Sequence, residues 1–146
     1  MVAPAKETPK HSIWLSNLDL IFSRSSTPVL YYYKPNADPA FFSQGLLKPA
    51  LAEALVPFYP LAGRLVLGPD GRMEIDCTGD GVLFVMARSD LSVSDIGDFA
   101  PSDKLRRLLV PGLESGVTPY ILFAIQVEYE PCILNSQLIR NGNILC

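Results

Sequence analysis

The side chains able to perform acid–base or nucleophilic chemistry are few in this chain. The single histidine is His11, which lies near the N-terminus beside Lys10. One imidazole excludes any site that requires two, and this position favours a surface or packing role. No serine occupies a Gly-x-Ser-x-Gly motif, and no cysteine has a histidine at a recognised spacing. The residue types and spacings alone therefore identify no catalytic site.

The remaining acidic and thiol side chains point to structural roles. Glu74 and Asp76 are two residues apart in an expected strand, so they share one face, and the neighbouring turn predicts that both are solvated. Cys77, Cys132 and Cys146 are odd in number and widely spaced. This pattern favours reduced thiols over a disulfide framework and lacks the Cys-x-x-Cys spacing of a zinc site. We therefore expect no metal site.

Composition and charge exclude several classes of function. The chain has 146 residues, of which 49% are hydrophobic and 18% charged, as expected for one globular domain or part of one. Twelve Lys and Arg against fifteen Asp and Glu give a net charge of −3, without the basic block that a nucleic-acid partner requires. Apolar stretches such as residues 120–125 are far shorter than the ~20 residues of a membrane-spanning helix, and the N-terminus has no secretory-signal pattern. We therefore expect a cytoplasmic protein with no nucleic-acid or membrane partner.

The elements that would position any site are short. Thirteen prolines and ten glycines interrupt the sequence and favour a mixed sheet with helices, an α+β fold. We expect a half-buried strand at residues 29–33 and a hairpin formed by residues 65–67 and 73–77. Residues 82–87 are expected to form a buried strand, and residues 120–130 a strand whose second half alternates between buried and exposed side chains. One expected helix begins near Leu47 and ends before Pro57, and a second follows the N-cap Ser102 and ends at Pro111. The first helix carries an apolar stripe of Leu46, Leu47, Ala50, Leu51, Ala54, Leu55 and Phe58.

Residues 133–146 differ in character from the rest of the chain. They show no sustained hydrophobic period, little charge and no place in the core pattern. We expect them to form a poorly ordered tail, unrelated to the domain formed by residues 1–132.

Several stretches stand in a characteristic order and spacing. They are residues 14–20, residues 27–35, and residues 55–65 with the motif Phe58-Tyr59-Pro60-Leu61-Ala62-Gly63-Arg64-Leu65. Residues 75–85, which begin Ile75-Asp76-Cys77, continue the pattern together with residues 97–101 and 126–127. Over residues 1–132 the chain resembles the N-terminal part of the plant BAHD acyltransferases, in particular the shikimate O-hydroxycinnamoyltransferase-like members.

The resemblance implies a cytosolic, cofactor-free and usually monomeric enzyme that moves an acyl group from a CoA thioester to an alcohol or amine. Its partners are the small-molecule acyl-CoA and acceptor, and its two domains surround a channel, so this chain would be part of the N-terminal domain. The family's base is the histidine of a His-x-x-x-Asp motif, which takes the acceptor's proton. Here His11 is followed four residues later by Leu15, and an Asp-Phe-Gly-Trp-Gly signature is also absent. We therefore expect no catalytic residue in this chain and no activity from it alone.

The resemblance assigns candidate binding residues in one segment of the chain only. Thr27 and Tyr31 match positions that line the acyl or acceptor pocket of hydroxycinnamoyltransferases, so they are candidate substrate contacts. Ordinary strand packing is the other interpretation of Tyr31, and Val29 replaces a frequent serine, which leaves the acceptor open. Two further hypotheses remain for the chain. In the first, the chain is a non-catalytic fragment whose binding partner is a phenolic ligand or a full-length relative. In the second, it is a truncated product that is unstable because its sheet edges are unpaired.

Overall fold

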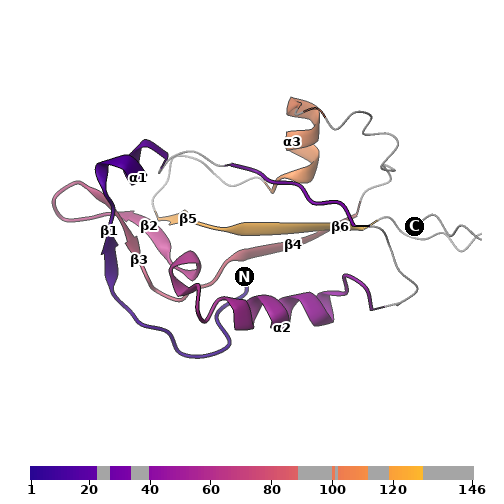
Figure 1. Cartoon of the computed structure of the whole chain (residues 1–146), viewed down its shortest axis with the longest axis horizontal. Coiled ribbons are helices and arrows are strands. Elements are labelled where there is room, and N and C mark those ends of the chain that lie inside the picture. The colour runs from indigo at the N-terminus through magenta and orange to yellow at the C-terminus, as the bar shows by residue number, and fades with distance from the viewer. Residues whose placement is uncertain (23–26, 34–39, 89–99, 101, 112–118, 130–146) are drawn as a thin grey trace, which may run out of the picture.

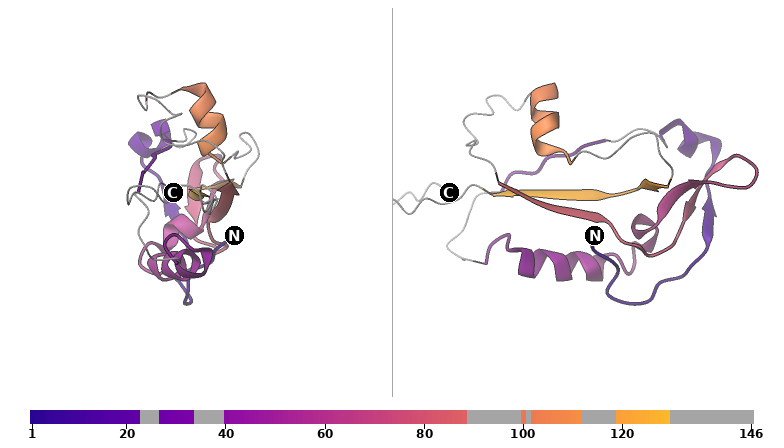
Figure 2. Two further views of the ribbon diagram at one scale, coloured as in Figure 1. Left: turned by 90° about the vertical axis from the view of Figure 1, so that its right-hand side faces the viewer. Right: turned by 180° about the vertical axis from the view of Figure 1, so that it is seen from behind.

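Helices and two sheets make up the structure, a computed structural model that describes residues 1–22, 27–33, 40–88, 100, 102–111 and 119–129. The fold is α+β, as the sequence predicts. Figure 1 shows a two-stranded sheet with the helix α2 (Gln44–Ala54) on one side and the helix α3 (Asp103–Leu109) on the other. The view from behind in Figure 2 shows the same layers. Within the described ranges, no helix is long and apolar enough to cross a membrane.

The larger sheet is antiparallel, with the strand order β1-β3-β2-β5. Its strands are β1 (Ser12–Trp14), β2 (Arg64–Leu67), β3 (Met73–Asp76) and β5 (Tyr120–Ile121). The predicted hairpin is confirmed, because β2 and β3 pair from Arg64↔Asp76 to Leu67↔Met73. The turn between them places Gly71 at a φ of 79°, a conformation that glycine adopts without steric penalty. The strand β1 had no counterpart among the sequence predictions.

The smaller sheet is parallel and consists of β4 (Leu83–Arg88) and β6 (Ala124–Tyr129), paired from Leu83↔Ala124 to Arg88↔Tyr129. The prediction of one continuous strand over residues 120–130 was wrong. The chain breaks at residues 122–123 because β5 pairs with β2 in one sheet and β6 pairs with β4 in the other. The strand at 82–87 is present, but β4 is half-buried rather than buried, since its only described partner strand is β6.

The helices differ from the predictions mainly at their N-terminal ends. The first helix was predicted to begin near Leu47, but α2 begins at Gln44, so Pro49 lies inside it. The missing N–H of Pro49 removes one hydrogen bond, to the carbonyl of Gly45, and the helix continues to Ala54. The prediction for α3 is confirmed: the Leu105 N–H donates to the Ser102 hydroxyl at 3.2 Å, and the helix ends before Pro111. The short helix α1 (Asn17–Phe22) and the 3-10 helix η1 (Tyr59–Ala62) complete the described helices.

The core lies where α2 ends and the two sheets meet. Its buried residues come from four parts of the chain: Val2, Leu55, Ala62 and Val82. Val2 and Val82 exchange two backbone hydrogen bonds of 2.9 Å, which attach the N-terminal residues to the start of β4. The predicted apolar stripe is therefore only partly confirmed: Leu55 is 2% exposed, whereas Leu46 and Phe58 are 58% and 63% exposed. The described core covers only the C-terminal end of α2.

The strand and the half-buried environment predicted for residues 29–33 were both wrong. These residues belong to no strand, and the exposure of their side chains ranges from 42% for Tyr32 to 72% for Tyr31. Aromatic and β-branched residues favour a strand only where a neighbouring strand accepts their backbone hydrogen bonds. No described strand pairs with this segment. We call residues 27–33 the aromatic segment.

Candidate functional site

The two predicted substrate contacts both lie on the aromatic segment and face solvent. Thr27 is exposed, and 72% of Tyr31 is accessible. Within the described part of the chain, neither side chain has a hydrogen bond or a ring contact. The structure therefore leaves both groups accessible to a ligand, and their role stays a prediction.

Aromatic contacts attach the C-terminal end of the aromatic segment to the turn before α2. The rings of Tyr33 and Phe42 have centroids 4.9 Å apart and planes inclined at 50°. The rings of Phe41 and Phe42 form an edge-on pair at 4.7 Å. Tilted and edge-on arrangements at such distances are favourable because the ring edges are positive and the faces negative. Sequence reasoning did not single out Phe41 or Phe42.

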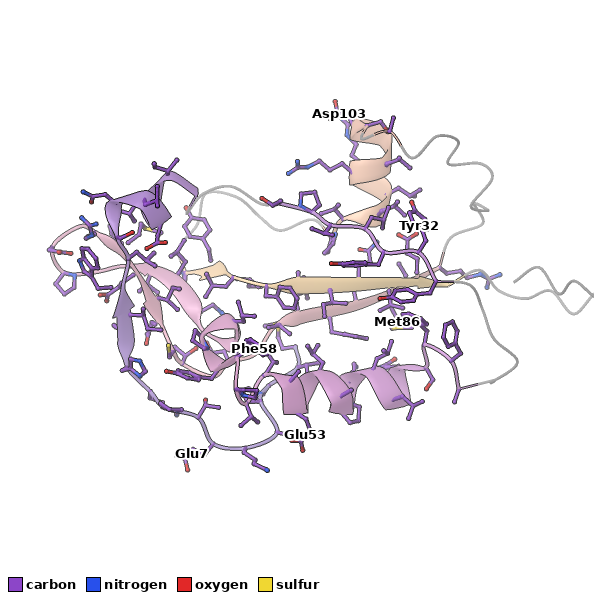
Figure 3. All side chains as sticks on the ribbon, in the orientation of Figure 1. Glu7, Tyr32, Glu53, Phe58, Met86 and Asp103 are labelled. Carbon is purple, nitrogen blue, oxygen red and sulfur yellow. The ribbon has the colours of Figure 1, made fainter. Side chains whose placement is uncertain are left out.

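The middle of the aromatic segment approaches β6 and α3. Figure 3 shows Tyr32 on the α3 side of the smaller sheet. Burial, and secondarily the charge of the Glu128 carboxylate, raise the pKa of the Tyr32 phenol above its ordinary value. The Gln126 amide donates to the Glu128 carboxylate at 2.8 Å and to the Leu108 carbonyl at 3.1 Å. Gln126 thus links β6 to α3.

His11 lies apart from this region, in the residues that precede β1. Its ring is paired with that of Tyr59 at a centroid distance of 5.8 Å, and its Nε2 is 3.5 Å from the Tyr59 hydroxyl. Its carbonyl accepts a 3.0 Å hydrogen bond from the Cys77 N–H. These are the contacts of a packing residue, in line with the sequence interpretation.

The Phe58-Tyr59-Pro60-Leu61-Ala62-Gly63-Arg64-Leu65 motif has a structural role. A Cβ at Gly63 would overlap the carbonyl oxygen of Asp76 on β3. The Arg64 guanidinium donates to the carbonyls of Gly63 at 2.7 Å and Gly81 at 2.8 Å, and its Nε lies 3.8 Å from the carboxylate of Asp80. We call residues 62–64 and 80–82 the junction, because these contacts join η1, β2 and the turn before β4.

The other candidate groups show no clustering. Glu74 and Asp76 are half-buried rather than solvated, because β3 lies between β1 and β2 in the sheet. Cys77 is a free, buried thiol, and burial, followed by the charge of Asp76, raises its pKa. Cys132 and Cys146 lie outside the described residues. In the described part of the chain, no three His, Cys, Asp or Glu side chains come together in a way that could hold a metal ion.

Sequence reasoning also missed a clasp centred on Arg72, in the turn between β2 and β3. Its guanidinium donates to the Leu15 carbonyl at 3.1 and 2.8 Å and to the Asn17 side chain at 2.7 Å. It also lies over the ring of Trp14, 4.6 Å from the centroid. The clasp fixes the start of α1 to the hairpin. Its partners are more than fifty residues away in sequence, so no local pattern predicts it.

Comparisons with known proteins agree with the motifs. The sequence profile of the Transferase family matches residues 1–132. The chain is 54% identical over 135 residues to putrescine hydroxycinnamoyltransferase 1 from Oryza sativa subsp. japonica, and 50% identical over 134 residues to shikimate O-hydroxycinnamoyltransferase from Nicotiana tabacum. Each alignment covers 90% of this chain, but 30% and 31% of the respective relative. Among solved structures, vinorine synthase has a TM-score of 0.47 and 32% identity, over 67% of this chain and 24% of that chain.

These matches fix the family and the extent of the shared sequence. The chain spans about a third of the length of the two hydroxycinnamoyltransferases. The profile match includes both the residues of the junction and the aromatic segment. The chain therefore belongs to the Transferase family, the family of the BAHD acyltransferases.

Proposed function

We propose that residues 1–132 are the N-terminal part of an acyltransferase that moves a hydroxycinnamoyl-type group from CoA to an alcohol or amine. The observation that carries the proposal is the identity of 54% and 50% to two hydroxycinnamoyltransferases, one named for an amine and the other for an alcohol acceptor. In the reaction, the acceptor oxygen or nitrogen attacks the thioester carbonyl, its proton passes to a base, and CoA leaves as the thiol. Thr27 and Tyr31 would contact the acyl or acceptor group.

We propose that His11 is not the base of this scheme. His11, the single histidine, packs on Tyr59 and has Leu15 rather than an aspartate four residues later. We propose that the base belongs to sequence outside these residues and that this chain alone is inactive. Loss of a general base typically lowers a rate by about 10²- to 10⁴-fold, and loss of acyl-CoA positioning lowers it further.

The experiment that tests the activity is a chimera. Residues 1–132 replace the matching part of the tobacco shikimate O-hydroxycinnamoyltransferase, and ester formation from p-coumaroyl-CoA and shikimate is measured by mass spectrometry. With putrescine as acceptor, the same assay follows the amide. We expect the chimera to turn over at least one of these acceptors. A folded chimera that is inactive with both acceptors would overturn the proposal.

A matched pair of variants in the chimera tests the two binding residues. Replacing Thr27 by Val and Tyr31 by Phe should raise the KM for acyl-CoA or acceptor about tenfold, which corresponds to ~1.4 kcal/mol of binding. Tyr33→Phe keeps the ring that packs on Phe42 and serves as the control, with an unchanged KM expected. If the variant with Thr27 and Tyr31 replaced has the same KM values as the Tyr33→Phe control, Thr27 and Tyr31 do not contact the substrates.

The inactivity of the 146-residue chain is tested separately. The purified chain is incubated with p-coumaroyl-CoA and either acceptor, and release of the CoA thiol is followed. We expect the rate of the protein-free control. Turnover by this chain would show that it holds a complete catalytic site.

A second candidate function is binding without catalysis. The exposed Thr27 and Tyr31 favour it, because a folded fragment that displays an aromatic ring such as that of Tyr31 can hold a phenolic ligand. A saturable response to p-coumaroyl-CoA in a calorimetric titration would support this role. An unstable product is the competing hypothesis, and it predicts no cooperative unfolding.

The setting of the proposed enzyme follows from the same family. We propose a cytoplasmic, monomeric protein with acyl-CoA as co-substrate, no bound cofactor, and neither nucleic acid nor membrane as partner. Residues 133–146 would lie outside the acyltransferase segment, since the family match ends at residue 132. This tail lies outside the described residues.

A further inference from the structure

The backbone at Phe42 is unusual. Its φ is 56°, and among the described residues it is the one non-glycine residue with a positive φ. The left-handed conformation is disfavoured for a bulky side chain and persists only where surrounding contacts fix it. Such residues concentrate at active sites and at clamps on ligand-binding segments.

The contacts of Phe42 show what fixes it. The Ser43 N–H donates to the Ala40 carbonyl at 2.9 Å, which closes a tight turn directly before α2. Within this turn the Phe42 ring contacts Phe41 at 4.7 Å and Tyr33 at 4.9 Å. A right-handed φ at Phe42 would swing its Cβ, and with it the ring, away from this pairing.

The partner of Phe42 belongs to a segment that has few other attachments. No described strand pairs with residues 27–33, so backbone hydrogen bonds of a sheet do not set their position. Tyr33 lies two residues after Tyr31 and at the end of the segment nearest α2. Figure 1 shows the start of α2 beneath the ends of β4 and β6, where the aromatic segment also ends. A contact at Tyr33 therefore limits where Tyr31 can lie.

We infer that Phe42 is a positioning residue: its left-handed turn and its ring anchor Tyr33 to the start of α2 and thereby place Tyr31 and Thr27 for substrate. The inference rests on the proposed function, in which Thr27 and Tyr31 contact the acyl or acceptor group. It adds a residue that touches no substrate and acts through Tyr33.

The test uses the full 146-residue chain labelled with 3-fluorotyrosine and observed by ¹⁹F NMR. Signals of Tyr31 and Tyr33 are assigned by single Tyr→Phe changes. Phe42→Gly permits the positive φ but removes the ring, whereas Phe42→Tyr keeps the ring. Phe58→Ala is the control, because Phe58 is an exposed phenylalanine at the other end of α2.

The anchor predicts a specific pattern of resonances. Phe42→Gly should move the Tyr33 signal to its position in the urea-unfolded chain, while Phe42→Tyr and Phe58→Ala leave it in place. Circular dichroism checks that each variant is folded. An unchanged Tyr33 signal in folded Phe42→Gly would show that Phe42 does not anchor Tyr33, regardless of any result from ligand binding.

The positioning role is tested in the chimera with the tobacco enzyme, labelled and assigned in the same way, by titration with p-coumaroyl-CoA read at Tyr31. Phe42→Gly should raise the apparent Kd at least about fivefold, whereas Phe42→Tyr should leave it at the value of the unmodified protein. An unchanged Kd in Phe42→Gly would overturn the positioning role, even if Tyr33 moves. If Tyr31 of the otherwise unmodified chimera does not respond, the proposed substrate contact fails, whereas the Tyr33 signal of the 146-residue chain still decides whether the anchor exists.

Discussion

The junction and the aromatic segment are held in opposite ways. At the junction, Ala62 and Val82 are fully buried, and the carbonyls of Gly63 and Gly81 accept hydrogen bonds from one guanidinium. In the aromatic segment, the side chains are 42% to 72% exposed from Val29 to Tyr33, the Tyr33 ring contacts the Phe42 ring, and no described strand pairs with the segment. The junction residues are therefore positioned by packing and hydrogen bonds within this chain. The position of the aromatic segment depends on a few side-chain anchors or on a ligand.

The largest expected effect comes from adding a methyl group at the junction. Gly81 has a φ of 95°, and a Cβ there would overlap the carbonyl of Val2. Gly81→Ala should lower the free energy of unfolding by about 3 kcal/mol or more, because both the backbone and Val2 must move. Urea denaturation followed by circular dichroism measures it.

The control for this change is Gly45→Ala on α2. A Cβ at Gly45 has no atom within 4 Å. In a helix, alanine is favoured over glycine by about 0.5–1 kcal/mol, so the control should be neutral or stabilising. Similar losses in both variants would show that the junction is not the tightly packed region described above.

A second effect tests the core beside the junction. Leu55 is 2% exposed and contacts the buried cluster, whereas Leu46 on the same helix is 58% exposed. Leu55→Ala should destabilise the chain by about 2–5 kcal/mol through lost burial and a cavity. Leu46→Ala should change the free energy of unfolding by about 0.5 kcal/mol or less. Equal effects in the same urea experiment would contradict the observed packing of α2.

Much of the fold was predictable because its signals are local. The hairpin of β2 and β3 follows from the turn residues Gly68-Pro69-Asp70-Gly71 between the two strand segments, and α3 follows from the Ser102 cap. The break between β5 and β6 was not predictable, since it depends on two different partner strands. The start of α2 was misplaced because Pro49 removes one hydrogen bond from the helix but does not end it.

The candidate site was less predictable than the fold. Thr27 and Tyr31 came from a family resemblance, and the local pattern gave the wrong conformation for their segment. Phe42 and Gln126 were missed because their contacts join residues distant in sequence, Tyr33 and Leu108. A positive φ at a phenylalanine has no signal in the sequence itself.

A third, smaller effect concerns pH and the buried thiol next to the junction. Cys77 is 1% exposed, and burial, then Asp76, raise its pKa above the ordinary value of 9.0. The folded state therefore holds this proton more tightly than the unfolded state. The resulting stability is fully present below pH 9.0 and is lost as the pH rises toward the raised value.

The measurement for Cys77 compares two pH profiles of unfolding. Above pH 9.0, the free energy of unfolding should fall with a slope of at most about 1.4 kcal/mol per pH unit from this group. In Cys77→Ala, the free energy of unfolding should fall less steeply with pH, because the contribution of the thiol is gone. The contribution of Tyr32, whose pKa is also raised, should remain. Parallel profiles for the two proteins would show that Cys77 is not buried as described.

The smallest effect is expected in the aromatic segment. Tyr31→Phe removes a hydroxyl that has no hydrogen bond in the described part of the chain and is on a side chain 72% exposed. The free energy of unfolding should change by no more than about 0.5 kcal/mol. A loss of about 2 kcal/mol would mean that Tyr31 packs in this chain and would sharpen the case for the strand interpretation.

Hydrogen–deuterium exchange on the intact 146-residue chain tests the contrast between the two regions most directly. Peptides covering residues 51–56 and 62–66 report the core and the junction, and a peptide covering residues 27–33 reports the aromatic segment. We predict exchange at least about a hundredfold slower than in the unfolded chain for the first two peptides, and less than about tenfold slower for the third. Exchange at the unfolded rate in all three, or equal protection in all three, would contradict the account.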